Sequence, residues 1–104
     1  MKTITKEELK KRLENDDIIL IDVLSEEEYK DSHIKGAVNI PLKMIGTKAE
    51  EKYDKDDEIV VYCSDADCNA SPTAAKKLED LGFKNVYDFE GGKKEWREAG
   101  YPME

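Results

Sequence analysis

Cysteine is scarce in this sequence, and long apolar runs are absent. The 104 residues include only two cysteines, Cys63 and Cys68. Two cysteines are too few for a scaffold built on disulfides, so each is expected to be either reactive or inert. No apolar stretch approaches the length of a membrane span, and residues 1–6 lack the apolar core of a signal peptide. These absences predict a cytoplasmic protein that does not associate with membranes.

Histidine and positive charge are also in short supply. His33 is the single histidine, and with two cysteines it gives too few ligands for a structural zinc site. Asp and Glu outnumber Lys and Arg by 25 to 17, for a net charge of −8. Because phosphate backbones are bound by clusters of Lys and Arg, this balance argues against a nucleic-acid partner. The length suits one domain spanning residues 1–104, and we expect a monomer without a metal or another cofactor.

Runs of β-branched and aromatic residues alternate along the chain with segments of helical periodicity. The strand-like runs are residues 18–23, 59–62 and 85–88, with shorter ones at 3–4 and near Val38. The helical segments are residues 5–13, a short one opening at Ser25, 42–52, 72–81 and one around 94–97. This order predicts an α/β fold with a central parallel sheet and helices on both faces, because parallel neighbours need crossover helices.

The strand-like run 59–62 leads directly into Cys63, the first candidate for a catalytic residue. In open α/β sheets, ligands bind outside the carboxyl ends of the strands. Ser71-Pro72 reads as an N-cap followed by a proline at the first helical position, which predicts a helix from Pro72 to Leu81. The positive end of that helix would lie near Cys63 and lower the pKa of its thiol. An inert, buried cysteine is the alternative, and the position at a strand end favours the reactive one.

The residues after Cys63 are small and polar, and we predict that they form a binding loop. Its members are Ser64, Asp65, Ala66, Asp67, Cys68, Asn69, Ala70 and Ser71. Successive backbone N–H groups in such a loop can form a cradle that binds an anion or a persulfide.

Three parts of the chain, taken in order, resemble the signatures of the single-domain rhodanese family. They are residues 21–41 (within them Ile21-Asp22-Val23, Glu28-Tyr29 and 33–41), residues 60–63 and residues 89–96. The resemblance covers nearly the whole chain and implies a rhodanese-like fold. It also implies a sulfurtransferase: Cys63 takes sulfane sulfur from a donor such as thiosulfate or a persulfide, holds it as a persulfide, and passes it to a thiol or cyanide acceptor.

The chain departs from this family pattern in two places. Leu24 stands where many relatives carry arginine, and the loop after Cys63 holds no basic residue, whereas most relatives have one there. Asp65 and Asp67 make the loop negative instead. Nearby carboxylates oppose both the binding of a dianion and the formation of a thiolate, so thiosulfate is disfavoured as the natural donor.

Three interpretations therefore stay open at this point. The first is sulfur transfer through Cys63. The second is a thiol redox or oxidation-sensing domain, in which Cys68 approaches Cys63 to within about 7 Å of Cα separation and resolves its oxidised form; otherwise Cys68 packs inward as a small apolar residue. The third is a rhodanese-like interaction module without catalysis. In each, His33 is expected to be structural and Trp96 to lie in the core.

Overall fold

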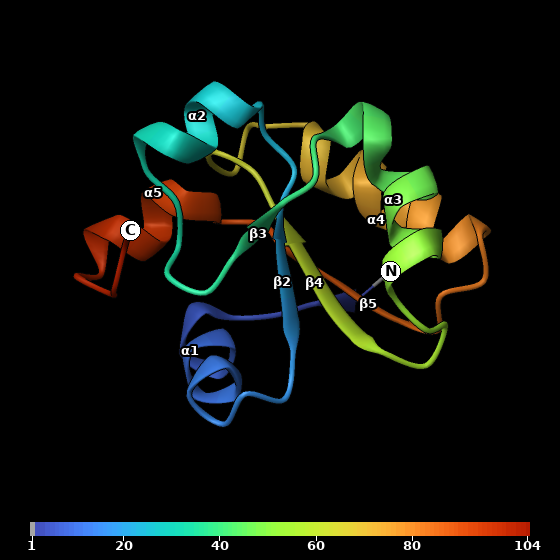
Figure 1. The fold of residues 1–104 in the computed structure, drawn as a ribbon. Helices are drawn as coiled ribbons and strands as arrows, with labels where there is room; N and C mark the ends of the chain where they lie inside the picture. The colour runs from blue at the N-terminus through green and yellow to red at the C-terminus, as the bar shows by residue number, and fades with distance from the viewer. Residues whose placement is uncertain (1) are drawn as a thin grey trace.

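The computed structural model of the protein describes residues 2–104 (Figure 1). The strands are β1 (Lys2–Thr3), β2 (Ile19–Asp22), β3 (Val38–Asn39), β4 (Glu58–Tyr62) and β5 (Asn85–Phe89). The helices are α1 (Lys6–Glu14), α2 (Glu26–Asp31), α3 (Ile45–Lys52), preceded by a 3-10 turn at Leu42–Met44, α4 (Ala70–Asp80) and α5 (Gly92–Glu98). Among the described residues, no helix is both long and apolar enough to cross a bilayer.

The five strands form one sheet in the order β1-β5-β4-β2-β3, and every neighbouring pair runs parallel. The predicted α/β architecture with a parallel sheet is confirmed. The predicted short strand at residues 3–4 is found one residue earlier, at the edge of the sheet beside β5. Strand β4 lies in the middle, which explains why its sequence is a continuous apolar run: it is buried on both faces.

Helices cover both faces of the sheet, as predicted (Figure 1). Alternate residues of β4 point to opposite sides, so Ile59 and Val61 pack with α3 and α4, while Val60 and Tyr62 pack toward α1 and α5. Trp96 on α5 is 2% exposed and lies in the second cluster, which confirms its predicted place in the core. The result is two apolar layers separated by the sheet.

Side-chain caps set the starts of α1 and α2, whereas α4 begins at another residue than predicted. Thr5 and Ser25 each accept a hydrogen bond from the backbone N–H three residues later, at 3.1 and 3.2 Å, so both predicted caps are confirmed. The predicted start of α4 at Pro72, with Ser71 as its N-cap, is wrong. The helix begins at Ala70 with Asn69 as N-cap, and Pro72 lies inside the first turn. Proline fits there because the first backbone N–H groups of a helix have no partner within it.

Candidate active site at the end of strand β4

Cys63 follows directly after β4, the middle strand. The register pairs Tyr62 with Asp22 of β2 on one side and with Phe89 of β5 on the other. Cys63 thus leaves the sheet between the carboxyl ends of both flanking strands, at the edge where ligands bind in open α/β sheets. Its side chain is 1% exposed. The cysteine predicted from the strand signal is therefore at the strand end, but it is covered.

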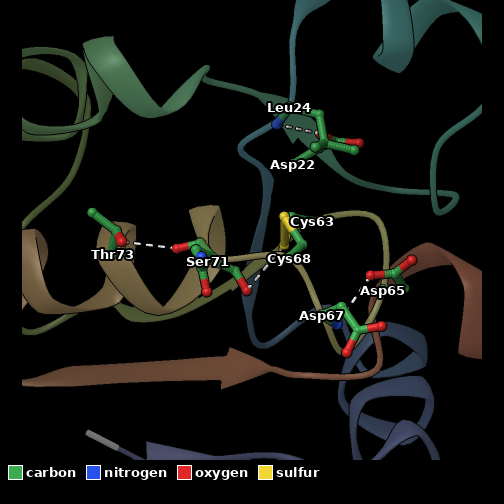
Figure 2. The surroundings of a disulfide bond; sticks show 9 residues. Asp22, Leu24, Cys63, Asp65, Asp67, Cys68, Ser71 and Thr73 are labelled. Atoms are coloured by element: carbon green, nitrogen blue, oxygen red, sulfur yellow. Dashed lines mark hydrogen bonds between the residues drawn. A yellow bond between two sulfur atoms is a disulfide. The ribbon is translucent and has the colours of Figure 1, made fainter.

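Cys68 is joined to Cys63 by a disulfide (Figure 2). The two Cα atoms lie 6.3 Å apart, inside the range that a disulfide allows. A turn in the loop produces this approach: the Cys68 N–H donates to the Asp65 carbonyl at 3.2 Å, and the Asp67 N–H donates to Asp65 Oδ1 at 3.0 Å. The structure shows the close approach of Cys68 to Cys63, and it also shows Cys68 packed against the apolar layer that contains Cys63.

The predicted loop residues differ in exposure. Ser64 and Asp65 are half-buried, as are Cys68 and Ala70, whereas Ala66, Asp67 and Asn69 are exposed. Figure 2 shows the carboxylates of Asp65 and Asp67 on the outer side of the loop, away from the disulfide. The backbone N–H groups of Ser64, Asp65, Ala66 and Asn69 donate to no other residue within 2–104. Part of the expected cradle is thus available, while the N–H groups of Asp67 and Cys68 are used inside the loop.

Ser71 faces the disulfide from the first turn of α4. Its side chain is 1% exposed, and its Oγ lies 3.5 Å from Cys63 Sγ. A sulfur in a disulfide has no proton to donate, so the hydroxyl is the donor in this contact, as it would be toward a thiolate. The revised start of α4 is what turns Ser71 inward: as the second residue of the helix it points at Cys63 instead of capping the helix.

Gly92 lies against the backbone of the loop that follows Cys63, a contact that the sequence did not predict. A Cβ at Gly92 would lie 2.5 Å from the Cys63 carbonyl oxygen and 2.8 Å from the Asp65 nitrogen, and its φ is +64°. This close approach lets the next two backbone N–H groups donate to the loop, Lys93 to the Cys63 carbonyl at 3.0 Å and Lys94 to the Ser64 carbonyl at 2.9 Å. The glycine pair at 91–92 was the available signal, but sequence alone does not say what approaches it.

Asp88 on β5 is a second residue that the sequence reasoning missed. It is fully buried, and neither carboxylate oxygen has a hydrogen-bond partner within residues 2–104. Burial raises the pKa of Asp88. A small cavity of about 30 Å³ lies beside it, enough for one water molecule. Its walls come from Ala66, Cys68, Ser71, Pro72, Asp88 and Glu90.

Asp22 braces the strand end beside the cysteine. It is fully buried and accepts hydrogen bonds from the Tyr62 hydroxyl at 2.8 Å and from the Leu24 N–H at 2.9 Å. Burial raises the pKa of Asp22, and these two donors oppose that rise. The Tyr62 hydroxyl also accepts from the Ile34 N–H at 3.1 Å. The residue just before Cys63 is thus locked in place, which fixes where the loop begins.

His33 makes its contacts away from the cysteine loop. Its Nδ1 lies 2.8 Å from the Tyr29 carbonyl, its ring stacks on that of Tyr29 at 3.7 Å, and its Nε2 lies 3.6 Å from a Glu104 carboxylate oxygen. These partners tie α2 to the end of the chain. They fit the structural role expected for His33.

Comparison with known proteins connects the site to a family. A sequence model described as a rhodanese-like domain matches residues 5–99. The thiosulfate sulfurtransferase GlpE of Coxiella burnetii is 32% identical over 81 residues, which are 78% of this chain and 73% of that protein. The HTH-type transcriptional regulator Rv0324 of Mycobacterium tuberculosis is 39% identical over 101 residues, 97% of this chain. This chain spans 44% of the length of Rv0324 and 49% of that of the Bacillus subtilis protein YrkF.

Solved structures agree with the sequence matches. The solution structure of the rhodanese-like domain from the Anabaena protein Alr3790 superposes with a TM-score of 0.90 at 28% identity, covering 100% of this chain and 79% of that one. The human single-domain sulfurtransferase TSTD1 gives a TM-score of 0.86 at 25% identity, covering 94% of this chain and 96% of that one.

Proposed function

We propose that this chain, which belongs to the rhodanese-like family, carries sulfane sulfur as a persulfide on Cys63 and passes it to a thiol or cyanide acceptor. One observation carries the proposal: Cys63 stands at the carboxyl end of the central strand with a hydroxyl 3.5 Å from its sulfur and a backbone loop around it. That is the arrangement a sulfur nucleophile needs. The relation to GlpE, a thiosulfate sulfurtransferase, supports it.

The chemistry begins with the reduced protein. The Cys63 thiolate attacks the outer sulfur of the donor, a new S–S bond forms on Cys63, and the rest of the donor leaves with the electron pair of the broken bond; with thiosulfate, that leaving group is sulfite. The Ser71 hydroxyl is placed to donate to the thiolate, and the unpaired N–H groups of the loop are donors for the charge of the persulfide. An acceptor thiolate then takes the outer sulfur and restores Cys63.

The charges near the loop favour a persulfide over thiosulfate as the donor. A groove of about 220 Å³ beside the loop, large enough for a small thiol, is lined by Asp65, Ala66, Asp67, Gly91, Lys94, Glu95 and Glu98. Four of these seven residues are acidic and one is basic. Such a surface repels a small dianion and accepts a donor of lower charge, such as the persulfide of a small thiol or of a partner protein.

Intact mass spectrometry tests the proposal directly. Reduced wild-type protein and the Cys63→Ser variant are incubated with a small-molecule persulfide and then with cyanide. We expect Cys63→Ser to gain no sulfur at position 63, because a serine hydroxyl is not ionised at neutral pH, and peptide mapping distinguishes this from any adduct on Cys68. A sulfur adduct on the reduced Cys68→Ser variant, located at Cys63 by peptide mapping and removed by cyanide, is the expected positive result. Turnover of Cys63→Ser near the wild-type rate would refute the assignment.

The disulfide favours thiol redox or oxidation sensing as a second candidate function. Under it, peroxide converts Cys63 to a sulfenate, and Cys68 displaces water to form the disulfide. Peroxide-treated wild-type protein should then lose the mass of two protons relative to the reduced form, and neither single serine variant should. An interaction module without catalysis is less well supported, since the chain keeps Cys63 and a hydroxyl aimed at its sulfur.

A further inference from the structure

The placement of Cys68 next to Cys63 bears on what happens to a persulfide once it forms. The loop turn at residues 65–68 brings the two Cα atoms to 6.3 Å, and the disulfide joins the two sulfur atoms. Cys68 is therefore within bonding reach of Cys63 Sγ, which is the inner sulfur of a persulfide on Cys63. A thiolate in that position can attack the inner sulfur and displace the outer one.

Exposure favours this internal reaction over attack by an outside thiol. Cys63 is 1% exposed, whereas Cys68 is half-buried at the rim of the loop. An external acceptor has to reach a nearly buried sulfur, while Cys68 already lies beside it and needs no diffusion. Holding two reacting groups side by side replaces a bimolecular step by an intramolecular one, which is among the largest rate effects available to a protein.

We infer that the chain reduces sulfane sulfur to sulfide: Cys68 resolves the Cys63 persulfide, releases hydrosulfide and leaves the Cys63–Cys68 disulfide. This rests on the proposed function, because it starts from the same persulfide. The Cys68 thiolate forms a bond to Cys63 Sγ, the bond between Sγ and the outer SH breaks, and the outer sulfur leaves as HS⁻ with the bonding pair. The Cys68 sulfur is oxidised and the outer sulfur is reduced.

A dithiol reductant completes the cycle. One of its thiolates attacks Cys68, the half-buried sulfur of the pair, and Cys63 leaves as a thiolate. The second thiol of the reductant then displaces Cys68 and closes its own disulfide. Overall, one sulfane sulfur and one dithiol give one sulfide and one cyclic or intramolecular disulfide. The structure, with its Cys63–Cys68 disulfide, corresponds to the oxidised form of the protein in this cycle.

The surroundings of Cys68 suit a departing sulfide. The Ser71 hydroxyl can donate to a sulfur at this site. The small cavity beside Cys68 has room for one sulfur atom. Asp88 borders the same cavity and has no hydrogen-bond partner within residues 2–104. Burial raises the pKa of this carboxyl, which is the direction that lowers the negative charge beside the place where hydrosulfide forms.

The test compares sulfide release and protein mass in three forms of the full chain. Wild type, Cys68→Ser and Cys63→Ser are reduced, freed of reductant and mixed with one equivalent of glutathione persulfide. A sulfide electrode measures the release of sulfide. Intact mass spectrometry of acid-quenched samples measures the mass of the protein. We expect wild type to release one sulfide per chain above the Cys63→Ser background and to end two protons lighter, with no persulfide left. Cys68→Ser should keep one extra sulfur on Cys63 and release none above background.

Other outcomes separate this inference from the proposed function. If wild type keeps the persulfide as stably as Cys68→Ser does, the inference is wrong and sulfur carriage by Cys63 stands. If neither protein ever gains sulfur, both fall. A Cys68→Ala variant that behaves unlike Cys68→Ser would show that the serine disturbs the loop, and Cys68→Ala then serves in its place. A glutathione adduct on Cys63 of that variant, in place of one extra sulfur, would mean that the wild-type disulfide forms without a persulfide and would contradict the inference.

Discussion

The four aspartates around Cys63 differ in how deeply their carboxylates are buried. Asp65 and Asp67 lie on the outer side of the loop (Figure 2), Asp67 exposed and Asp65 half-buried. Asp22 and Asp88 are fully buried, and burial raises the pKa of both. The outer pair therefore acts on incoming molecules through its charge, and the inner pair acts on stability.

The outer pair should control the use of an anionic donor. Replacing both residues, Asp65→Asn with Asp67→Asn, removes two negative charges from the loop and should lower the KM for thiosulfate several-fold, with the larger effect at low salt, where screening is weak. Steady-state kinetics at two ionic strengths check this. The single Asp80→Asn variant, at the end of α4, shows the effect of losing one carboxylate away from the loop. An unchanged KM in the double variant would mean that the two carboxylates do not act on the donor.

The inner carboxyl of Asp88 should make stability fall as pH rises. Its pKa is raised in the folded protein above the ordinary value of 3.8, so the folded state binds more protons than the unfolded state as soon as pH passes that value. The free energy of unfolding then decreases with pH until the folded-state pKa is passed, and is flat above it. Asp88→Asn removes this decrease, and we expect the variant to lose less stability than wild type as pH rises from 4 to 7.

Urea denaturation at several pH values measures that difference. Asp22 contributes a fall of the same sign, so wild type and Asp88→Asn should both lose stability with rising pH, the variant less steeply. Parallel curves for the two proteins would show that Asp88 ionises normally in the folded state.

The sequence predicts best those elements whose own residues show a burial pattern or a helix cap. Strand β4 is buried on both faces and so reads as an unbroken apolar run, and α1 and α2 carry their caps in sequence. The start of α4 was missed because Ser71-Pro72 is compatible with two positions in a first turn. Which position applies depends on how Ser71 packs against Cys63, a contact that no local pattern encodes.

The site was harder to predict than the fold for the same reason. Cys63 and its loop follow from the strand and from the small polar residues after it. Asp88, on β5, and Gly92, at the start of α5, lie beside the loop only because the sheet order places β5 next to β4. Both residues looked like ordinary members of a turn and a strand. Their roles depend on β5 lying beside β4.

We predict that Gly92, at the start of α5, supports the backbone of the loop that follows Cys63. A methyl group at Gly92 would meet the backbone of Cys63 and Asp65, and φ is +64° there, whereas Gly100 has φ +76° and open space around it. Gly100→Ala should therefore cost only the left-handed strain of about 1 kcal/mol. Gly92→Ala should cost more and should also slow persulfide formation on Cys63, because the loop has to move.

Denaturation and the rate of Cys63 persulfidation, measured on both reduced variants, separate strain from displacement. Equal losses of stability and equal rates in Gly92→Ala and Gly100→Ala would contradict the support role.

Across the whole molecule, the fold rests on the two apolar layers and not on the disulfide. Among residues 2–104, twenty-two buried hydrophobic residues fill these layers, on both faces of one parallel sheet. The disulfide joins residues only five apart, and it lies at the edge of the sheet. A cross-link that closes so short a loop removes little entropy from the unfolded chain.

Reduction should therefore leave the protein folded, as both proposals require. The chain-entropy relation gives a contribution of about 2 kcal/mol for a loop of this length, against about 5–15 kcal/mol for the stability of a typical domain. We expect urea denaturation with and without a dithiol reductant to show one cooperative transition, shifted by no more than that amount, and the Cys68→Ser variant to match the reduced wild type. A reduced protein without a cooperative transition would make the disulfide a structural element, and the redox cycle through Cys63 and Cys68 would then be impossible.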